Sequence, residues 1–272
     1  MRTYRFIILA AILFVSCSAL MSQREQAREI RVREAKAKDI PFVYDKKDFG
    51  KIEIKSVSKA IVEEGVQGFP VEAPAHSCFY LEDKRPLPAF EKGARYFYPT
   101  YSFICVLPLT DASVKDFGKS YPYLNEAAVK LRALLKKRPN EFNYYNDIND
   151  LPFNNAGQSI QSRVQYNDFK TGTGVLFLTQ YTQESFPNPI NNEELTYNFQ
   201  GITNDGKFYI AARLAVTHPS LPKGIDFTDH IERDEKHCYL KEGEKKLNAL
   251  AEGSFQPSLR NLKALISSLK VE

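Results

Sequence analysis

The chain has 272 residues, a formal net charge of +4 and no tryptophan. Its hydrophobic share of 43% and charged share of 26% are ordinary for globular proteins, which excludes a wholly disordered chain. The basic residues form no block of like charge, so we expect no nucleic-acid partner. The 19 Phe and 15 Tyr favour β-sheet, because aromatic rings suit half-buried pleated surfaces.

The N-terminus has the organisation of a secretory signal. Arg2 and Arg5 precede an apolar run at residues 6–15, which is too short to span a bilayer and matches the core of a signal peptide. The letters FVSC at residues 14–17 resemble the lipobox of bacterial lipoproteins, with Phe14 where Leu is usual. In that family the Cys is acylated and becomes the first residue of the mature protein. The resemblance implies a lipid on Cys17 and attachment to a membrane.

A second processing site stays open, because cleavage after Ala19 would release a soluble product. The predicted organisation has three parts: a signal at residues 1–19 (ending at 16 if Cys17 is acylated), a tether at 20–48, and one domain at 49–272. The tether is expected to be helical or flexible, since it is charged and contains no Gly or Pro between residues 22 and 39.

Three cysteines remain once Cys17 is set aside, namely Cys78, Cys105 and Cys238. An exported protein meets an oxidising compartment, where one disulfide and one free thiol is the simplest outcome. Cys78 and Cys105 lie in predicted strands, so they are the pair that a disulfide would join. The alternative is that all three are buried, reduced cysteines that act as small apolar residues.

The first half of the domain is predicted to contain strands near residues 51–55, 76–81 and 96–109. The first alternates polar and apolar residues, which is typical of a half-buried strand. Residues 102–107 form a continuous apolar run, which indicates a strand covered on both faces.

Helices are predicted after these strands and at the C-terminus. The first covers residues 126–138, with Asn125 as its N-cap and an apolar stripe of Ala128, Leu131 and Leu135. Residues 226–252 are expected to form one or two helices, interrupted at Gly243. Pro257 opens the last helix, whose stripe is Leu259, Leu262, Ile266 and Leu269.

Residues 163–218 show the densest pattern, with four alternating segments separated by turn residues. The connectors at 170–174 and 203–207 carry Gly, Asn and Asp, which hairpins use for unusual backbone angles. We therefore predict an antiparallel meander. The fold class is α+β, a single domain with a largely antiparallel sheet packed by helices mainly on one face.

Parts of this region resemble a pattern in uncharacterised exported bacterial proteins. The shared stretches are YNDFKTGTGVLFLTQY at 166–181, PINNEELTYNFQG at 189–201 and HPSLP at 218–222. The resemblance implies a bacterial origin. It implies no activity, cofactor or catalytic residue.

The loop at residues 182–194 is long for a hairpin connection, and long loops are often functional. Its apolar and amide side chains would suit a protein, peptide or glycan partner, with these candidate contacts: Phe186, Asn188, Ile190, Asn191 and Asn192. The alternative is that the loop folds back and caps the edge of the sheet.

No catalytic constellation stands out in the sequence. His76 and Cys78 would share one face of a strand, but two ligands do not define a metal site. The Asn- and Asp-rich loop at 140–158 lacks the spacing of a calcium loop, and Gly-x-Ser-x-Gly is absent. We therefore assign no metal, cofactor or catalytic residue.

The sequence thus predicts an exported, lipid-anchored protein of the cell envelope. We expect a non-catalytic module that binds a partner protein or an envelope component, or that has a structural role. The alternatives are an envelope hydrolase with an unrecognised site and a carrier of small molecules or lipids.

Overall fold

A computed structural model gives the structure of the chain. It describes residues 40, 42, 44, 47–57, 73–83, 102–111, 116–143, 147–149, 151, 156–182, 189–224 and 236–272. The chain divides into two compact units, residues 1–40 and 41–272, and the second contains the sheet and helices below. The predicted signal with Cys17, most of the tether, and the side chains of Phe186 and Asn188 lie outside the described residues.

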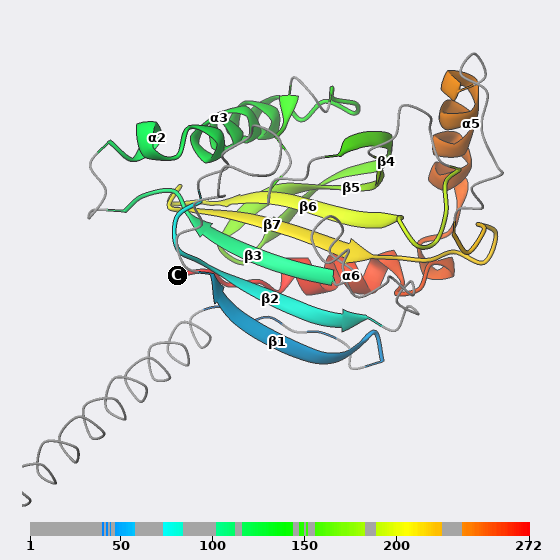
Figure 1. Cartoon of the computed structure of the whole chain (residues 1–272), viewed down its shortest axis with the longest axis horizontal. Coiled ribbons are helices and arrows are strands. Elements are labelled where there is room, and N and C mark those ends of the chain that lie inside the picture. The colour runs from blue at the N-terminus through cyan, green and yellow to red at the C-terminus, as the bar shows by residue number, and fades with distance from the viewer. Residues whose placement is uncertain are drawn as a thin grey trace, which may run out of the picture. The chain divides into compact units, whose positions relative to one another are not determined.

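Seven antiparallel strands form one open sheet (Figure 1). In chain order they are β1 (Phe49–Val57), β2 (His76–Asp83), β3 (Ser102–Pro108), β4 (Gly157–Phe169), β5 (Gly172–Thr182), β6 (Thr196–Thr203) and β7 (Phe208–Ala215). Their order across the sheet is β1-β2-β3-β7-β6-β5-β4. The predicted α+β class and the meander are confirmed, since β4 to β7 pair consecutively, and β3 joins them by pairing with β7.

The helices of the described part occupy the β3–β4 connection and the C-terminal quarter. They are α2 (Phe117–Ser120), α3 (Pro122–Lys137), α5 (Lys236–Ala249), the 3-10 turn η1 (Glu252–Ser254) and α6 (Leu259–Ser267). α3 begins before the predicted N-cap Asn125, because Pro122 suits the first helical turn, where its missing N–H is not needed.

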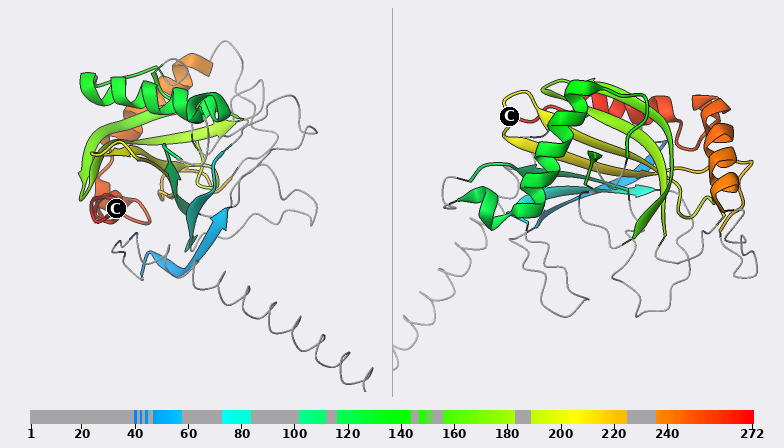
Figure 2. Two further views of the ribbon diagram at one scale, coloured as in Figure 1. Left: turned by 90° about the vertical axis from the view of Figure 1, so that its left-hand side faces the viewer. Right: turned by 90° about the horizontal axis from the view of Figure 1, so that it is seen from above.

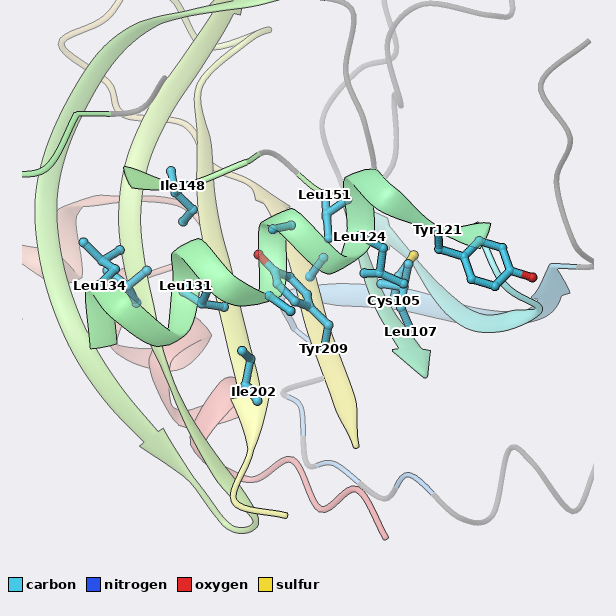
Figure 3. Packing of buried hydrophobic residues seen from close by; sticks show 14 of the residues in the cluster. Cys105, Leu107, Tyr121, Leu124, Leu131, Leu134, Ile148, Leu151, Ile202 and Tyr209 are labelled. Atoms are coloured by element: carbon cyan, nitrogen blue, oxygen red, sulfur yellow. The ribbon is translucent and has the colours of Figure 1, made fainter. Parts of the chain in front are cut away.

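α3 lies across one face of the sheet and buries an apolar stripe against it (Figure 3). The buried residues of the helix are Leu124, Ala127, Ala128, Leu131 and Leu134. Leu134 takes the place predicted for Leu135, which is only partly buried. Ile202 and Tyr209 face the helix from β6 and β7. The two alanines leave room for the helix to lie close to the strands.

α6 lies on the opposite face of the sheet from α3 (Figure 2), where the sequence analysis had expected helices mainly on one face. Asn167 of β4 donates from Nδ2 to Ser267 Oγ of α6 at 3.1 Å, whereas the hydroxyl of its neighbour Tyr166 reaches the Pro139 carbonyl beyond α3 at 2.8 Å. Successive strand residues point to opposite faces, so the two helices cover the two sides. The central strands are accordingly buried on both faces, as the continuous apolar run of β3 indicated.

The glycines after the β4–β5 turn serve close packing. Their place in a hairpin connector predicted unusual backbone angles, but among the described glycines only Gly206 has a positive φ, of 73°. Gly172 and Gly174 lie within β5. A Cβ on Gly174 would lie 2.4 Å from the Phe199 ring and 2.5 Å from the Gln200 carbonyl oxygen, so a side chain does not fit.

α5 runs unbroken through Gly243, contrary to the predicted interruption. A Cβ on Gly243 would lie 2.3 Å from Cδ1 of Ile190. The glycine therefore admits the Ile190 side chain against the helix. It marks a contact between the β5–β6 loop and α5.

Candidate functional site

The β5–β6 loop, which the sequence singled out for partner binding, is described from Pro189 onward. Ile190 is 3% exposed and Asn191 is fully buried, while Asn192 is half-buried. These three side chains therefore contact their own domain. Phe186 and Asn188, the other two candidates, lie outside the described residues.

Asn191 organises the end of the loop. Its backbone N–H donates to Gln180 Oε1 at 3.1 Å, and its side-chain oxygen accepts the N–H groups of Glu193 and Glu194, each at 3.0 Å. Gln180 Nε2 donates to the Pro189 carbonyl at 3.2 Å. An Asn side chain that bonds the backbone two and three residues ahead stabilises a turn. The described end of the loop, from Pro189 onward, therefore folds back onto the sheet, which was the alternative to partner binding.

Asn192 joins the loop to residues 218–222. Its side-chain Nδ2 donates to the carbonyls of His218 at 3.1 Å and Leu221 at 3.0 Å, and its Oδ1 accepts the His218 N–H at 2.7 Å. The Asn192 N–H donates to the Pro222 carbonyl at 2.9 Å. The segments at residues 189–195 and 218–222 are therefore in direct contact.

His218 is buried beside this contact, with 6% of its surface exposed. Its Nδ1 accepts the N–H of Ser220 at 3.2 Å and lies 2.7 Å from Ser220 Oγ; with Nδ1 as the acceptor, the proton of the neutral ring is on Nε2. Nε2 lies 2.9 Å from Ser254 Oγ, which itself donates to the Ala251 carbonyl at 2.7 Å. Burial, and then the positive charge of Arg163, lower the pKa of His218 and favour this neutral form.

The position of the proton on the His218 ring determines whether His218 can act as a base toward Ser254. A nucleophilic serine needs an unprotonated imidazole nitrogen that accepts its hydroxyl proton. Here Nε2 donates and the Ser254 oxygen accepts. The pair therefore holds residues 218 and 254 together and does not activate the serine.

Arg163 connects this cluster to α5 from a bulge in β4. The register between β4 and β5 shifts between Ser162 and Gln165, and Arg163 has a φ of +54°. Its guanidinium donates to the Leu247 carbonyl at 2.8 Å and lies 5.5 Å from the centre of the Phe255 ring. Phe255 in turn packs against His218, with ring centres 5.0 Å apart. Sequence reasoning missed Arg163, because nothing local marks a bulge.

Arg213 of β7 is a buried cation of the central sheet. It is 6% exposed, and its guanidinium lies 4.5 Å from the Tyr181 ring centre and 5.6 Å from that of Phe103. Tyr181 accepts from Asn198 Nδ2 at 2.6 Å. Stacking on two rings stabilises the guanidinium away from water.

Cys78 and Cys105 form a disulfide between β2 and β3, the pairing put forward in the sequence analysis. They are directly opposite each other in the strand register, with Cα atoms 4.1 Å apart. Both sulfurs are buried under α3, whereas Cys238 on α5 is free and exposed. His76 lies two residues before Cys78 and on the same side of β2.

The part of the chain that the structure describes has one group of three metal-ligand residues, His76, Cys78 and Cys105. No helix among the described residues is long and apolar enough to cross a membrane. Comparison of the chain with protein-family models, curated proteins and solved structures gives no match.

Proposed function

We propose that the chain is an exported, lipid-anchored protein of the bacterial envelope that acts as a non-catalytic binding or structural module. The observation that carries the proposal is the Cys78–Cys105 disulfide. Structural disulfides persist in oxidising compartments outside the cytosol. The disulfide, which lies in the folded domain, thus supports the export that residues 2–17 predict.

The geometry at His218 favours a module over a hydrolase. Its protonated Nε2 donates a hydrogen bond to Ser254 Oγ, so this serine–histidine contact lacks a general base. The surrounding hydrogen bonds, from Asn192 and Arg163, join loops and helices to the sheet. They make a rigid scaffold of the kind that presents a binding loop.

The proposed contact with a partner protein or envelope component rests on Phe186 and Asn188. Ile190, Asn191 and Asn192 act as the fixed base of the loop, because they are held by α5, Gln180 and the 218–222 segment. Residues that are already packed need no ordering on binding, which lowers the entropic cost of association.

Thiol trapping in acid-quenched cells tests the export part of the proposal. Alkylation with a maleimide polymer in denaturant, which exposes the buried cysteines, and before any reduction should modify Cys238 and spare Cys78 and Cys105. The matched control is Leu9→Arg, which breaks the apolar run of the signal and should keep the chain in the cytosol with both cysteines reactive. Free Cys78 and Cys105 in the wild-type cells would contradict export.

Site-specific photocrosslinking tests the binding part. A photoreactive amino acid at position 186 or 188 should give a discrete adduct with an envelope component. The matched control is the same amino acid at position 129, because Val129 is 56% exposed on the outer side of α3. Equal adducts from all three positions, or none from 186 and 188, would remove the loop from the proposal.

A further inference from the structure

We propose that His76, Cys78 and Cys105 form a Zn²⁺ site that becomes available when the Cys78–Cys105 disulfide is reduced. This site does not depend on the proposed binding function. It belongs to the reduced form of the chain, in which Cys78 and Cys105 are no longer linked.

The strand register brings the three ligands together. Cys78 is directly opposite Cys105 on β3, and His76 is two residues away on the same side of β2. One ligand atom of each residue lies within 4.8 Å of the others. Tetrahedral Zn²⁺ with Zn–S distances of about 2.3 Å needs sulfurs about 3.8 Å apart, which fits two unlinked cysteines facing each other on neighbouring strands.

The His76 ring is already held in the form that binds a metal. Nδ1 lies 2.8 Å from the Pro74 carbonyl oxygen, which can only accept, so Nδ1 carries the proton. Nε2 therefore has a free electron pair. A backbone carbonyl on the second nitrogen is the usual orienting contact of zinc-bound histidines.

The charge balance favours a divalent ion such as Zn²⁺ over a monovalent one. Reduction of the disulfide by a dithiol adds two electrons and two protons and oxidises the dithiol. Zn²⁺ then displaces both protons, leaving two thiolates and one dication with no net charge. A neutral site suits Cys78 and Cys105, which are 2% and 1% exposed within the apolar cluster under α3. Monovalent copper would leave a buried negative charge there. Three protein ligands leave a fourth position for water or another ligand.

Metal titration of the reduced chain tests the proposal. The chain carries Cys17→Ala and Cys238→Ser, so that Cys78 and Cys105 are its only thiols. It is reduced with a phosphine in denaturant, refolded without oxygen, and titrated with Zn²⁺ and with Co²⁺ as a spectroscopic probe. We expect one Zn²⁺ per chain, and Co²⁺ bands typical of tetrahedral coordination with thiolate charge transfer. The disulfide-linked chain should show neither.

Two histidine variants separate the site from adventitious binding. His76→Ala should weaken Zn²⁺ binding by at least about a hundredfold, since loss of an orienting partner alone costs 10–100-fold. His237→Ala, next to Cys238 in the sequence, should bind as the parent does. If the reduced chain is unfolded without metal, folding on addition of Zn²⁺ supports the site. Absence of Zn²⁺ binding, equal binding by the oxidised chain, or an unchanged affinity in His76→Ala would overturn the proposal.

Discussion

Arg163 closes the C-terminal end of α5: its Nε donates a hydrogen bond of 2.8 Å to the Leu247 carbonyl. Its Nη2 reaches the Asn248 carbonyl at 3.3 Å, and its own N–H donates to Asn248 Oδ1 at 2.7 Å. The last carbonyls of a helix have no partner within the helix. A bulge in the edge strand β4 therefore supplies the cap that α5 needs.

Replacement of Arg163 should destabilise the domain, and alanine should destabilise it more than glycine does. Arg163→Ala removes charge-assisted hydrogen bonds and should lower the free energy of unfolding by about 2–3 kcal/mol. Arg163→Gly should cost about 0.5–1 kcal/mol less, because the positive φ of this position strains alanine but not glycine. Urea unfolding with the disulfide intact measures both. Glycine worse than alanine, as in an ordinary strand, would contradict the bulge.

Protonation of His218 should weaken the fold below neutral pH. Burial and the Arg163 charge lower its pKa in the folded chain, so the unfolded chain, with a pKa near 6.5, binds the proton more readily. The contribution of neutral His218 to stability is fully present above pH 6.5. It is lost as the pH falls from 6.5 through the pKa of His218 in the folded chain. His76, whose pKa is also lowered by burial, acts in the same direction.

The variant His218→Gln isolates the contribution of this ring. Wild type should be more stable than the variant at pH 7.5, and the difference should shrink at pH 5, while His76→Gln serves as the parallel case. Urea unfolding at the two pH values gives the difference directly. A gap that is constant with pH would show that His218 titrates normally.

Gly174→Ala should be destabilising by about 1–3 kcal/mol, the usual cost of overpacking. The new Cβ would lie 2.5 Å from the Gln200 carbonyl oxygen, which belongs to the neighbouring strand and cannot move aside. Gly253→Ala is the matched control, because nothing lies within 4 Å of its Cβ position. Equal thermal shifts in the two variants would disprove the close-packing role.

Loss of the disulfide should lower stability through the unfolded chain. The bridge spans a sequence separation of 27, for which the loop-closure estimate is about 3.5 kcal/mol. The variant Cys78→Ser with Cys105→Ser should unfold at correspondingly lower urea concentration, and Cys238→Ser should match wild type. A double variant as stable as wild type would exclude a structural role for the bridge.

Much of the fold could be predicted because period-two alternation and helical stripes are local signals. The four strands of the meander and the stripe of Leu259, Leu262 and Ile266 follow from them directly. The face of the sheet that each helix covers does not follow from these local signals. α3 and α6 both carry one apolar stripe, and only the path of the chain around the sheet places them on opposite sides.

The candidate site was less predictable, because its determinants are distant in sequence. Ile190 was predicted to meet a partner, yet it is buried against Gly243 of α5, which a strand-and-turn pattern cannot reveal. His76 and Cys78 were recognised as sharing a face. Cys105 completes their group only through the register of β2 with β3.

Lipid labelling is the sharpest test of whether this scaffold is attached to the envelope through Cys17. Cells expressing wild type or Cys17→Ala are grown with a clickable palmitate analogue, and the protein is isolated and probed for the label. If Cys17 carries the lipid, the wild type should be labelled and the variant should not. Unlabelled wild type, or label that persists in Cys17→Ala, would contradict attachment through Cys17.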